Sequence, residues 1–145
     1  MSEFVTHNEA ETEHVGRQLA CGLAAGDVIL LSGPLGAGKT ALTRGLAAGL
    51  GCDATAVSSP TFTLIQEYDG PIRLQHVDLY RLAPDEVDDL ALEDLLEQSV
   101  LAVEWPERWR RAPAAAMTIA IELTGESSRR IVVRQARPGA QRSTR

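Results

Sequence analysis

The sequence predicts one α/β domain with a central mixed β-sheet, flanking helices and antiparallel hairpins. Two continuous apolar runs, Val28–Leu31 and Val100–Val103, are typical of strands that are buried on both faces of a sheet. Apolar residues that recur at spacings of four from Val15 onward indicate an amphipathic helix. A length of 145 residues suits a single domain with one core. We expect this domain to span residues 1–137, followed by a disordered basic tail over residues 138–145.

The N-terminal part of the chain is expected to alternate strands and helices. Glu3–Thr6 reads as a short strand. Asn8 is a typical helix N-cap, and the acidic residues directly behind it complement the positive end of a helix, which we expect to end near Gly26. The buried strand Val28–Leu31 follows, and then a glycine-rich loop leads into a helix over residues 39–50.

The remainder of the chain carries two hairpin signals. An Asp-Gly pair at residues 69–70 separates two apolar-rich runs and predicts an antiparallel pair of strands. A Gly-Glu-Ser turn at residues 125–127 predicts a second hairpin. The expected elements are strands at 61–65 and 72–79, a helix from Pro84 to about Gln98, a buried strand at 100–103 that ends at Glu104, and strands at 117–123 and 130–133.

The composition excludes several classes of protein. With 44% hydrophobic residues, 23% charged residues and a net charge of −6, the chain is neither disordered nor a general nucleic-acid-binding protein. The start has no signal-peptide pattern, and no run approaches the ~18 apolar residues that span a bilayer. Two cysteines cannot form a disulfide framework. We therefore expect a cytoplasmic protein that does not associate with membranes.

The segment Gly33–Thr40 reads GPLGAGKT and matches the phosphate-binding pattern G-x-x-x-x-G-K-[ST] between a strand and a helix. Its glycines allow successive backbone N–H groups to point inward around phosphates, at the positive end of the following helix. Lys39 is the only lysine among 14 basic residues and supplies a charge to the phosphates, while the Thr40 hydroxyl suits Mg²⁺. The predicted nucleotide-binding residues of this loop are Gly33, Gly36, Ala37, Gly38, Lys39 and Thr40.

A phosphate loop requires a further carboxylate, normally at the end of a neighbouring buried strand. Glu104 follows the apolar run Val100–Val103, whereas polar residues interrupt the strand that ends at Asp78. We favour Glu104 together with Thr40 as metal ligands, with Asp78 orienting or deprotonating the attacking water, although the two carboxylates can exchange roles. His76 shares a strand face with Asp78 and is expected to be a hydrogen-bonded core residue.

The nucleotide and the reaction class are less fully determined by the sequence. Because there is no second lysine, the guanine-reading loop of GTPases is absent and ATP is the expected nucleotide. One alternative function is a small-molecule kinase with an arginine lid, and another is a nucleotide-gated binding module that acts as a switch. Two interpretations apply to the segment after Glu104: its aromatic side chains pack over a loop, or the segment contacts a partner or covers the nucleotide. The segment contains Trp105, Arg108, Trp109, Arg110 and Arg111.

Four motifs together resemble the bacterial TsaE family, also called YjeE. They are GPLGAGKT at 33–40, SPTFTL at 59–64, HVDLYRL at 76–82 and EWPE at 104–107, in the family's order and approximate spacing. The resemblance implies a small cytoplasmic ATPase with weak activity alone. Such a protein works with TsaB and TsaD, where TsaD transfers threonylcarbamoyl to the adenosine beside the anticodon of tRNAs that read codons beginning with A. The family member hydrolyses ATP to reset that complex rather than performing the transfer.

The resemblance also assigns roles by position. Lys39 and the loop would hold the phosphates, Thr40 and Glu104 would hold Mg²⁺, and Asp78 would act on the water. Thr61 would sense the γ-phosphate. The nucleotide's base would contact the start of the first helix, with Asn8 and Thr12 as the expected residues, and Trp105 would act in turnover or docking.

The sequence departs from the family pattern at two positions. Pro34 stands where an acidic residue is common, and Leu90-Ala91-Leu92 stands where a glycine is frequently found before the Leu-Glu pair. From Ser127 onward the chain has six arginines and no acidic residue. This basic C-terminal edge is expected to be solvated, with an approach to tRNA or an acidic partner surface as the alternative.

Overall fold

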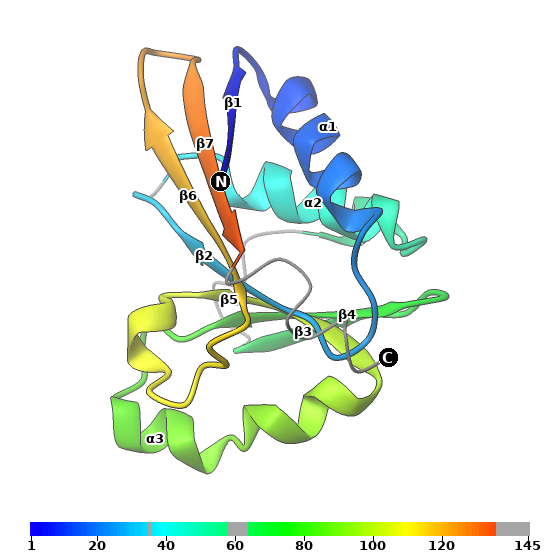
Figure 1. Ribbon diagram of the computed structural model, residues 1–145, viewed down its shortest axis with the longest axis vertical. Helices are drawn as coiled ribbons and strands as arrows, with labels where there is room; N and C mark the ends of the chain where they lie inside the picture. The colour runs from blue at the N-terminus through cyan, green and yellow to red at the C-terminus, as the bar shows by residue number, and fades with distance from the viewer. Residues whose placement is uncertain (35, 58–63, 136–145) are drawn as a thin grey trace.

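Seven strands form one mixed sheet in the computed structural model, which describes residues 1–34, 36–57 and 64–135 (Figure 1). The strands are β1 (Ser2–Thr6), β2 (Val28–Ser32), β3 (Ile65–Tyr68), β4 (Arg73–Asp78), β5 (Ser99–Glu104), β6 (Met117–Leu123) and β7 (Arg129–Gln135). Their order across the sheet is β1-β7-β6-β2-β5-β4-β3. The central pairs β6-β2, β2-β5 and β5-β4 are parallel, whereas β1, β3 and β7 run antiparallel to their neighbours. The expected α/β fold with a mixed sheet and hairpins is confirmed.

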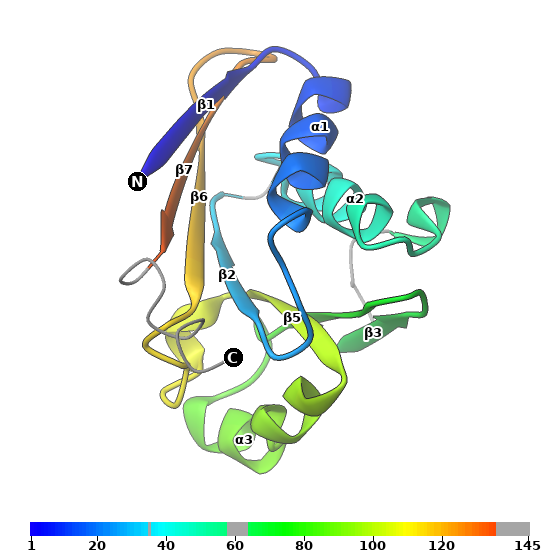
Figure 2. The same ribbon diagram turned by 45° about the vertical axis from the view of Figure 1, so that its right-hand side comes forward.

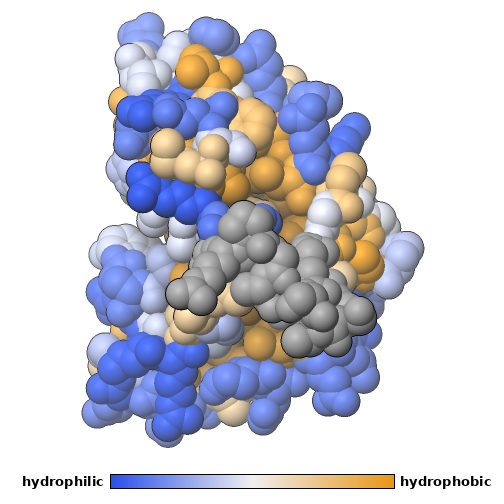
Figure 3. All heavy atoms as spheres, viewed as in Figure 1, coloured by the Kyte–Doolittle hydropathy of each residue, from blue (hydrophilic) through white to orange (hydrophobic). Residues whose placement is uncertain are grey.

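Helices cover both faces of this sheet (Figures 1 and 2). The α-helices are α1 (Glu9–Ala20), α2 (Lys39–Gly49) and α3 (Pro84–Asp89), and 3₁₀ turns occur at Ala54–Ala56, Leu92–Glu97 and Pro106–Arg108. One buried cluster joins α1 and α2 to one face of the sheet, and a second joins α3 and the Leu92–Glu97 turn to the other face. Hydrophilic side chains cover the lower region around α3 in the view of Figure 3. Within the described residues no helix has the length and apolar character needed to cross a bilayer.

Helices α1 and α2 pack in backbone contact because glycine occupies their crossing point. A Cβ on Gly45 would lie 2.0 Å from the carbonyl oxygen of Glu13, and a Cβ on Gly16 would lie 2.3 Å from that of Leu42. Any side chain at either position would force the helices apart. This close approach places the start of α1 beside the start of α2, where the glycine-rich loop enters.

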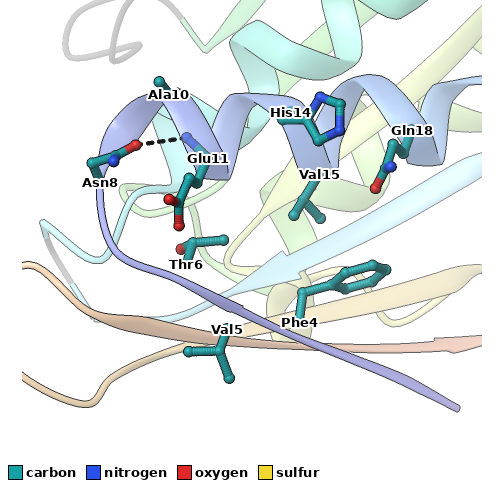
Figure 4. A pocket seen from close by; sticks show the side chains of 9 residues that line it. All are labelled: Phe4, Val5, Thr6, Asn8, Ala10, Glu11, His14, Val15 and Gln18. Carbon is teal, nitrogen blue, oxygen red and sulfur yellow. Dashed lines mark hydrogen bonds between the residues drawn. The ribbon is translucent and has the colours of Figure 1, made fainter.

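The first helix begins as expected and ends early. The Asn8 side chain accepts a hydrogen bond from the backbone N–H of Glu11 at 2.8 Å, so the predicted N-cap is confirmed (Figure 4). The helix stops at Ala20 rather than near Gly26. Leu23 lies in the turn after the helix and is buried in the core from there. Its apolar spacing therefore reflects burial and not a helical conformation.

The helix expected from Pro84 to about Gln98 was wrong in its length. Helix α3 ends at Asp89, and Ala91 adopts a left-handed conformation (φ 51°, ψ 51°) before the 3₁₀ turn Leu92–Glu97. The change of direction buries Leu92 in the same cluster as Val87. Apolar spacing alone could not distinguish this broken path from one continuous helix.

The hairpin expected around Asp69-Gly70 is confirmed as the antiparallel pair of β3 and β4. Its first strand is shifted toward the turn, because β3 runs from Ile65 to Tyr68 and includes the polar residues Gln66 and Glu67. Residues 61–63 of the expected strand lie outside the described residues, as does the expected tail over 138–145.

Replacing Ala91 with glycine is expected to stabilise the chain. A left-handed alanine costs about 1–2 kcal/mol, which exceeds the roughly 0.4–1 kcal/mol that glycine's extra freedom adds to the unfolded state. We therefore expect the free energy of unfolding, measured with urea, to rise by about 1 kcal/mol. The same exchange at Ala48, within α2, should lower it by about 1 kcal/mol. A destabilised Ala91→Gly variant would contradict the strain.

Candidate nucleotide-binding site

The glycine-rich loop connects the end of β2 to the start of α2 in the centre of the sheet. Gly36 and Gly38 have positive φ values of 79° and 106°, and Gly38 is the N-cap of α2. A residue with a side chain would be strained in the Gly38 conformation. The first turn of α2 contains no acidic residue, so the positive end of the helix is available to an anion. Leu35 lies outside the described residues.

Lys39 is held by three kinds of contact at the base of this loop. Its Nζ donates a hydrogen bond to the carbonyl oxygen of Gly33 at 2.8 Å and lies 3.4 Å from Oε1 of Glu104. The same Nζ is 5.9 Å from the ring centroid of Trp105. Only 11% of the lysine side chain is exposed. The single lysine is thus a nearly buried cation in the phosphate loop.

Glu104 is the last residue of β5 and lies where the carboxyl ends of three neighbouring parallel strands, β2, β5 and β4, come together. It lies opposite Leu31 of β2 and Asp78 of β4 in the strand register. Its Oε2 is 2.7 Å from Nε2 of His76, while its Oε1 faces Lys39. Burial raises the pKa of the Glu104 carboxyl, but the hydrogen bond and charge of His76, together with Lys39, outweigh burial and leave that pKa lowered.

His76 is confirmed as the hydrogen-bonded core residue that the sequence predicts, and its partner is Glu104. Its side chain is fully buried, and its hydrogen bond orients the carboxylate of Glu104. Nδ1 of His76 has no hydrogen-bond partner among the described residues. The sequence did contain a signal for this contact. His76 lies two residues before Asp78 and so shares its strand face, and Glu104 is opposite Asp78 in the parallel register of β4 and β5.

Asp78 lies beside Glu104 at the end of β4. Its Oδ1 accepts a hydrogen bond from the backbone N–H of Tyr80 at 2.9 Å, and the residue is half-buried. Thr40, in the first turn of α2, is also half-buried. Asp78 and Glu104 therefore lie side by side at the ends of β4 and β5, and Glu104 contacts Lys39, which precedes Thr40 at the start of α2.

The start of α1 reaches the loop through Thr12. A Cβ on Gly38 would lie 3.7 Å from Cγ2 of Thr12, and the Thr12 hydroxyl is 2.8 Å from that of Thr6. Asn8 lines a pocket of about 450 Å³ between β1 and α1, into which Phe4 and Val15 also project (Figure 4). Thr61, the expected γ-phosphate sensor, lies outside the described residues.

The two tryptophans after β5 have different environments. Trp109 is buried in the core beneath α3, whereas Trp105 is only half-buried and faces Lys39. Trp105 packs against the exposed Tyr80 with ring centroids 4.8 Å apart and ring planes tilted by 46°, and the guanidinium of Arg108 lies over both rings. Trp105 also has a left-handed backbone (φ 60°), so this segment combines strain with an exposed aromatic surface.

Two of the three arginines at 108–111, the candidates for a kinase lid, contact α3 or the segment before it. Arg110 forms ion pairs at 2.6 Å with Asp85 and with Asp88 of α3. Arg108 donates a hydrogen bond to the carbonyl oxygen of Leu82 at 2.8 Å. These contacts place the guanidinium of Arg110 on α3 and that of Arg108 on the segment just before α3.

Comparison with known proteins identifies the family of the chain. The family model described as "Threonylcarbamoyl adenosine biosynthesis protein TsaE" matches residues 6–132. The chain belongs to the TsaE family. The family resemblance of the four motifs is thus confirmed, and with it a place in tRNA threonylcarbamoyladenosine biosynthesis.

Two relatives and one solved structure show the extent of this similarity. Nostoc sp. TsaE is 43% identical over 135 residues, covering 89% of this chain and 83% of its own length. TsaE of Bacillus subtilis is 42% identical over 129 residues, covering 87% and 80%. The crystal structure of Bacillus subtilis YdiB has a TM-score of 0.79 and 32% identity, and the match covers 97% of this chain and 89% of that one.

We expect Glu104→Gln to lower the free energy of unfolding of the TsaE chain at pH 7, because glutamine carries no charge opposite Lys39. In the folded chain the pKa of Glu104 lies below its ordinary value of 4.5. The stabilisation is therefore present above pH 4.5 and is lost as the pH falls through the lowered pKa.

Urea unfolding at a series of pH values measures this effect. The difference in stability between the unsubstituted chain and Glu104→Gln should shrink as the pH falls below 4.5. Glu93→Gln, at an exposed acid of the Leu92–Glu97 turn, provides the control. A Glu104→Gln difference that stays constant from neutral to acid pH would contradict the assignment.

Proposed function

We propose that this TsaE chain is a Mg²⁺-dependent ATPase required for threonylcarbamoylation of the adenosine next to the anticodon in tRNAs that read A-starting codons. Its hydrolysis of ATP regulates or resets a complex of TsaB and TsaD and does not itself transfer the threonylcarbamoyl group. The observation that carries the proposal is the buried pair of Lys39, in the phosphate loop, and Glu104, at the end of β5, with Nζ and Oε1 3.4 Å apart.

Phosphate binding would use the glycine-rich loop, the start of α2 and Lys39, which lie next to one another. The left-handed glycines turn the loop, and the start of α2 would present its first backbone N–H groups to the β- and γ-phosphates. Lys39 lies at the base of the loop, held by Gly33 and Glu104. Bound phosphates would compete with both of these contacts for the lysine charge.

The donor set fits Mg²⁺ held jointly by protein and nucleotide. Thr40 offers a hydroxyl and Glu104 a carboxylate that is ionised because its pKa is lowered. Among the described residues no group of three His, Cys, Asp or Glu side chains could hold a metal by itself. Mg²⁺ commonly takes one or two protein ligands, with phosphate oxygens and waters completing its octahedron. When bound, it would neutralise charge on the phosphate oxygens.

Asp78 is proposed to orient or deprotonate the attacking water. It lies next to Glu104 in register and on the same face of the sheet. The hydrogen bond that its carboxylate accepts from the backbone N–H of Tyr80 holds the carboxylate at the end of β4. The exchanged assignment, with Asp78 on the metal, remains distinguishable by experiment. Thr61 is proposed as the γ-phosphate sensor, and Asn8 and Thr12 as contacts of the base.

Lys39→Ala is expected to lower ATP turnover by at least ~10²-fold, the scale of losing one preorganised charge donor. Arg44→Ala is the matched control, because Arg44 carries the same charge on the same helix and pairs with Glu13 at 3.0 Å. Phosphate release by both variants and by the unsubstituted chain measures the effect. Retained turnover in Lys39→Ala would exclude this loop as the catalytic site.

The regulatory part of the proposal is tested by adding TsaB, TsaD and tRNA to the same assay. Turnover should be weak alone and strongly stimulated by the partners, and the stimulation should be absent in Lys39→Ala. If turnover ignores the partners and responds instead to a small phosphate acceptor, the kinase alternative replaces the switch. Omitting tRNA or either protein in turn separates their contributions.

The metal assignment is tested by comparing Glu104→Ala with Asp78→Ala. Loss of a metal ligand should raise the Mg²⁺ concentration for half-maximal turnover by at least about tenfold and affect ATP binding less. We expect this response from Glu104→Ala. Asp78→Ala should slow turnover at saturating Mg²⁺ without shifting its Mg²⁺ dependence. The reverse pattern would move the metal to Asp78.

A further inference from the structure

Arg129 reaches from the C-terminal hairpin to the back of the phosphate loop. Its Nε donates a hydrogen bond to the carbonyl oxygen of Ala37 at 2.9 Å, and its Nη2 donates to that of Gly36 at 3.3 Å. The two ends of these bonds are 92 and 93 residues apart in the chain. A single guanidinium therefore joins two consecutive carbonyl groups of the loop.

The position of Arg129 is itself fixed by three strands. It is the first residue of β7 and lies opposite Leu123 of β6 and Thr6 of β1. Its Nη1 donates to the carbonyl oxygen of Ser128 at 3.0 Å. The planar guanidinium presents its donors in a rigid fork.

The same hairpin touches the loop at a second place. A Cβ on Gly33 would lie 2.7 Å from the carbonyl oxygen of Ile121 in β6. The loop thus enters against β6 at Gly33 and is held by β7 at Gly36 and Ala37. The β6–β7 hairpin forms a backing wall for the phosphate loop.

The hydrogen bonds from Arg129 affect anion binding by the loop because each peptide group is planar and rigid. The N–H and C=O groups of one peptide point in opposite directions across a planar unit. The carbonyl groups of Gly36 and Ala37 share their peptides with the N–H groups of Ala37 and Gly38. The Ala37 N–H donates to the carbonyl oxygen of Pro34 at 3.1 Å, which tightens the turn. The Gly38 N–H is therefore the one that Arg129 leaves directed away from the guanidinium, toward the anion side of the loop. A nest whose N–H directions are fixed in advance loses less conformational freedom when it binds an anion.

We propose that Arg129 is a positioning residue for the phosphate loop, which it holds in its anion-binding conformation through the carbonyl groups of Gly36 and Ala37. The inference rests on the proposed binding of ATP at this loop. It separates Arg129 from the solvated basic edge expected from the sequence. Arg130, the next residue, shows the contrast, because it pairs with Glu3 and Glu122 on the strands.

The experiment compares Arg129→Ala with Arg130→Ala in the full chain. Hydrogen bonds from a charged donor support an expected weakening of ATP binding by about tenfold in Arg129→Ala. At saturating ATP the turnover number should change by less than about twofold, because Arg129 does not touch the reacting atoms. Arg130→Ala should bind ATP as the unsubstituted chain does.

Two further measurements separate positioning from charge and from folding. Arg129→Lys keeps the charge without the fork, so it should bind ATP more like Arg129→Ala than like the unsubstituted chain. Amide hydrogen exchange in the nucleotide-free protein should be faster at residues 36–38 in Arg129→Ala and unchanged there in Arg130→Ala. Equal exchange in both variants, or full ATP affinity in Arg129→Lys, would overturn the proposal.

The outcomes also distinguish this inference from the proposed function. If the unsubstituted chain fails to bind ATP, the proposed function fails, while hydrogen exchange still reports whether Arg129 holds the loop. If the unsubstituted chain binds ATP and Arg129→Ala binds it equally well, only the role of Arg129 fails. Circular dichroism and thermal unfolding verify that each variant is folded; should Arg129→Ala not fold, Arg129→Lys carries the binding and exchange comparisons.

Discussion

The arrangement of the site depends on one buried carboxylate, that of Glu104. An ionised carboxylate without partners is far too costly to bury, so its surroundings must supply a charge and hydrogen bonds. Lys39 supplies the charge and His76 a hydrogen bond, one to each carboxylate oxygen. Because these residues come from β5, the start of α2 and β4, satisfying one charge fixes the relative positions of three elements. These residues can meet because the central strands β2, β5 and β4 are parallel, so their carboxyl ends lie on the same side of the sheet.

Backbone contacts made possible by glycine supply the second constraint. The crossing of α1 and α2 at Gly16 and Gly45 sets the start of α1 beside the loop, where Thr12 approaches Gly38. On the opposite side the loop meets the β6–β7 hairpin at Gly33. The phosphate loop is therefore enclosed by elements from both ends of the chain. Its conformation is a property of the whole fold rather than of the eight-residue motif.

The parts of the fold that the sequence predicted correctly are those with local causes. The Asn8 cap, the strand before the loop and both hairpins follow from neighbouring residues, and all of them are found. The break at Ala91 was missed because burial of Leu92 outweighs helical spacing there. Candidate residues of the loop and Glu104 followed from motif and strand ends. Arg129 could not be found that way, because no sequence rule links an arginine to carbonyl groups some 90 residues away.

The proposed switch acquires a physical route from the same ion pair. The charges of Lys39 and Glu104 face each other, so the groups that would hold phosphate and metal are engaged with one another. Bound phosphates and Mg²⁺ would draw these two charges to new partners. Trp105 follows Glu104 directly, has the Lys39 Nζ over its ring and packs at a tilt against the exposed Tyr80. A change at the ion pair would therefore reach an aromatic surface within one residue, and the left-handed backbone of Trp105 stores strain at that point. A partner that contacts Tyr80 or Arg108 would be placed to sense the state of the nucleotide without touching it.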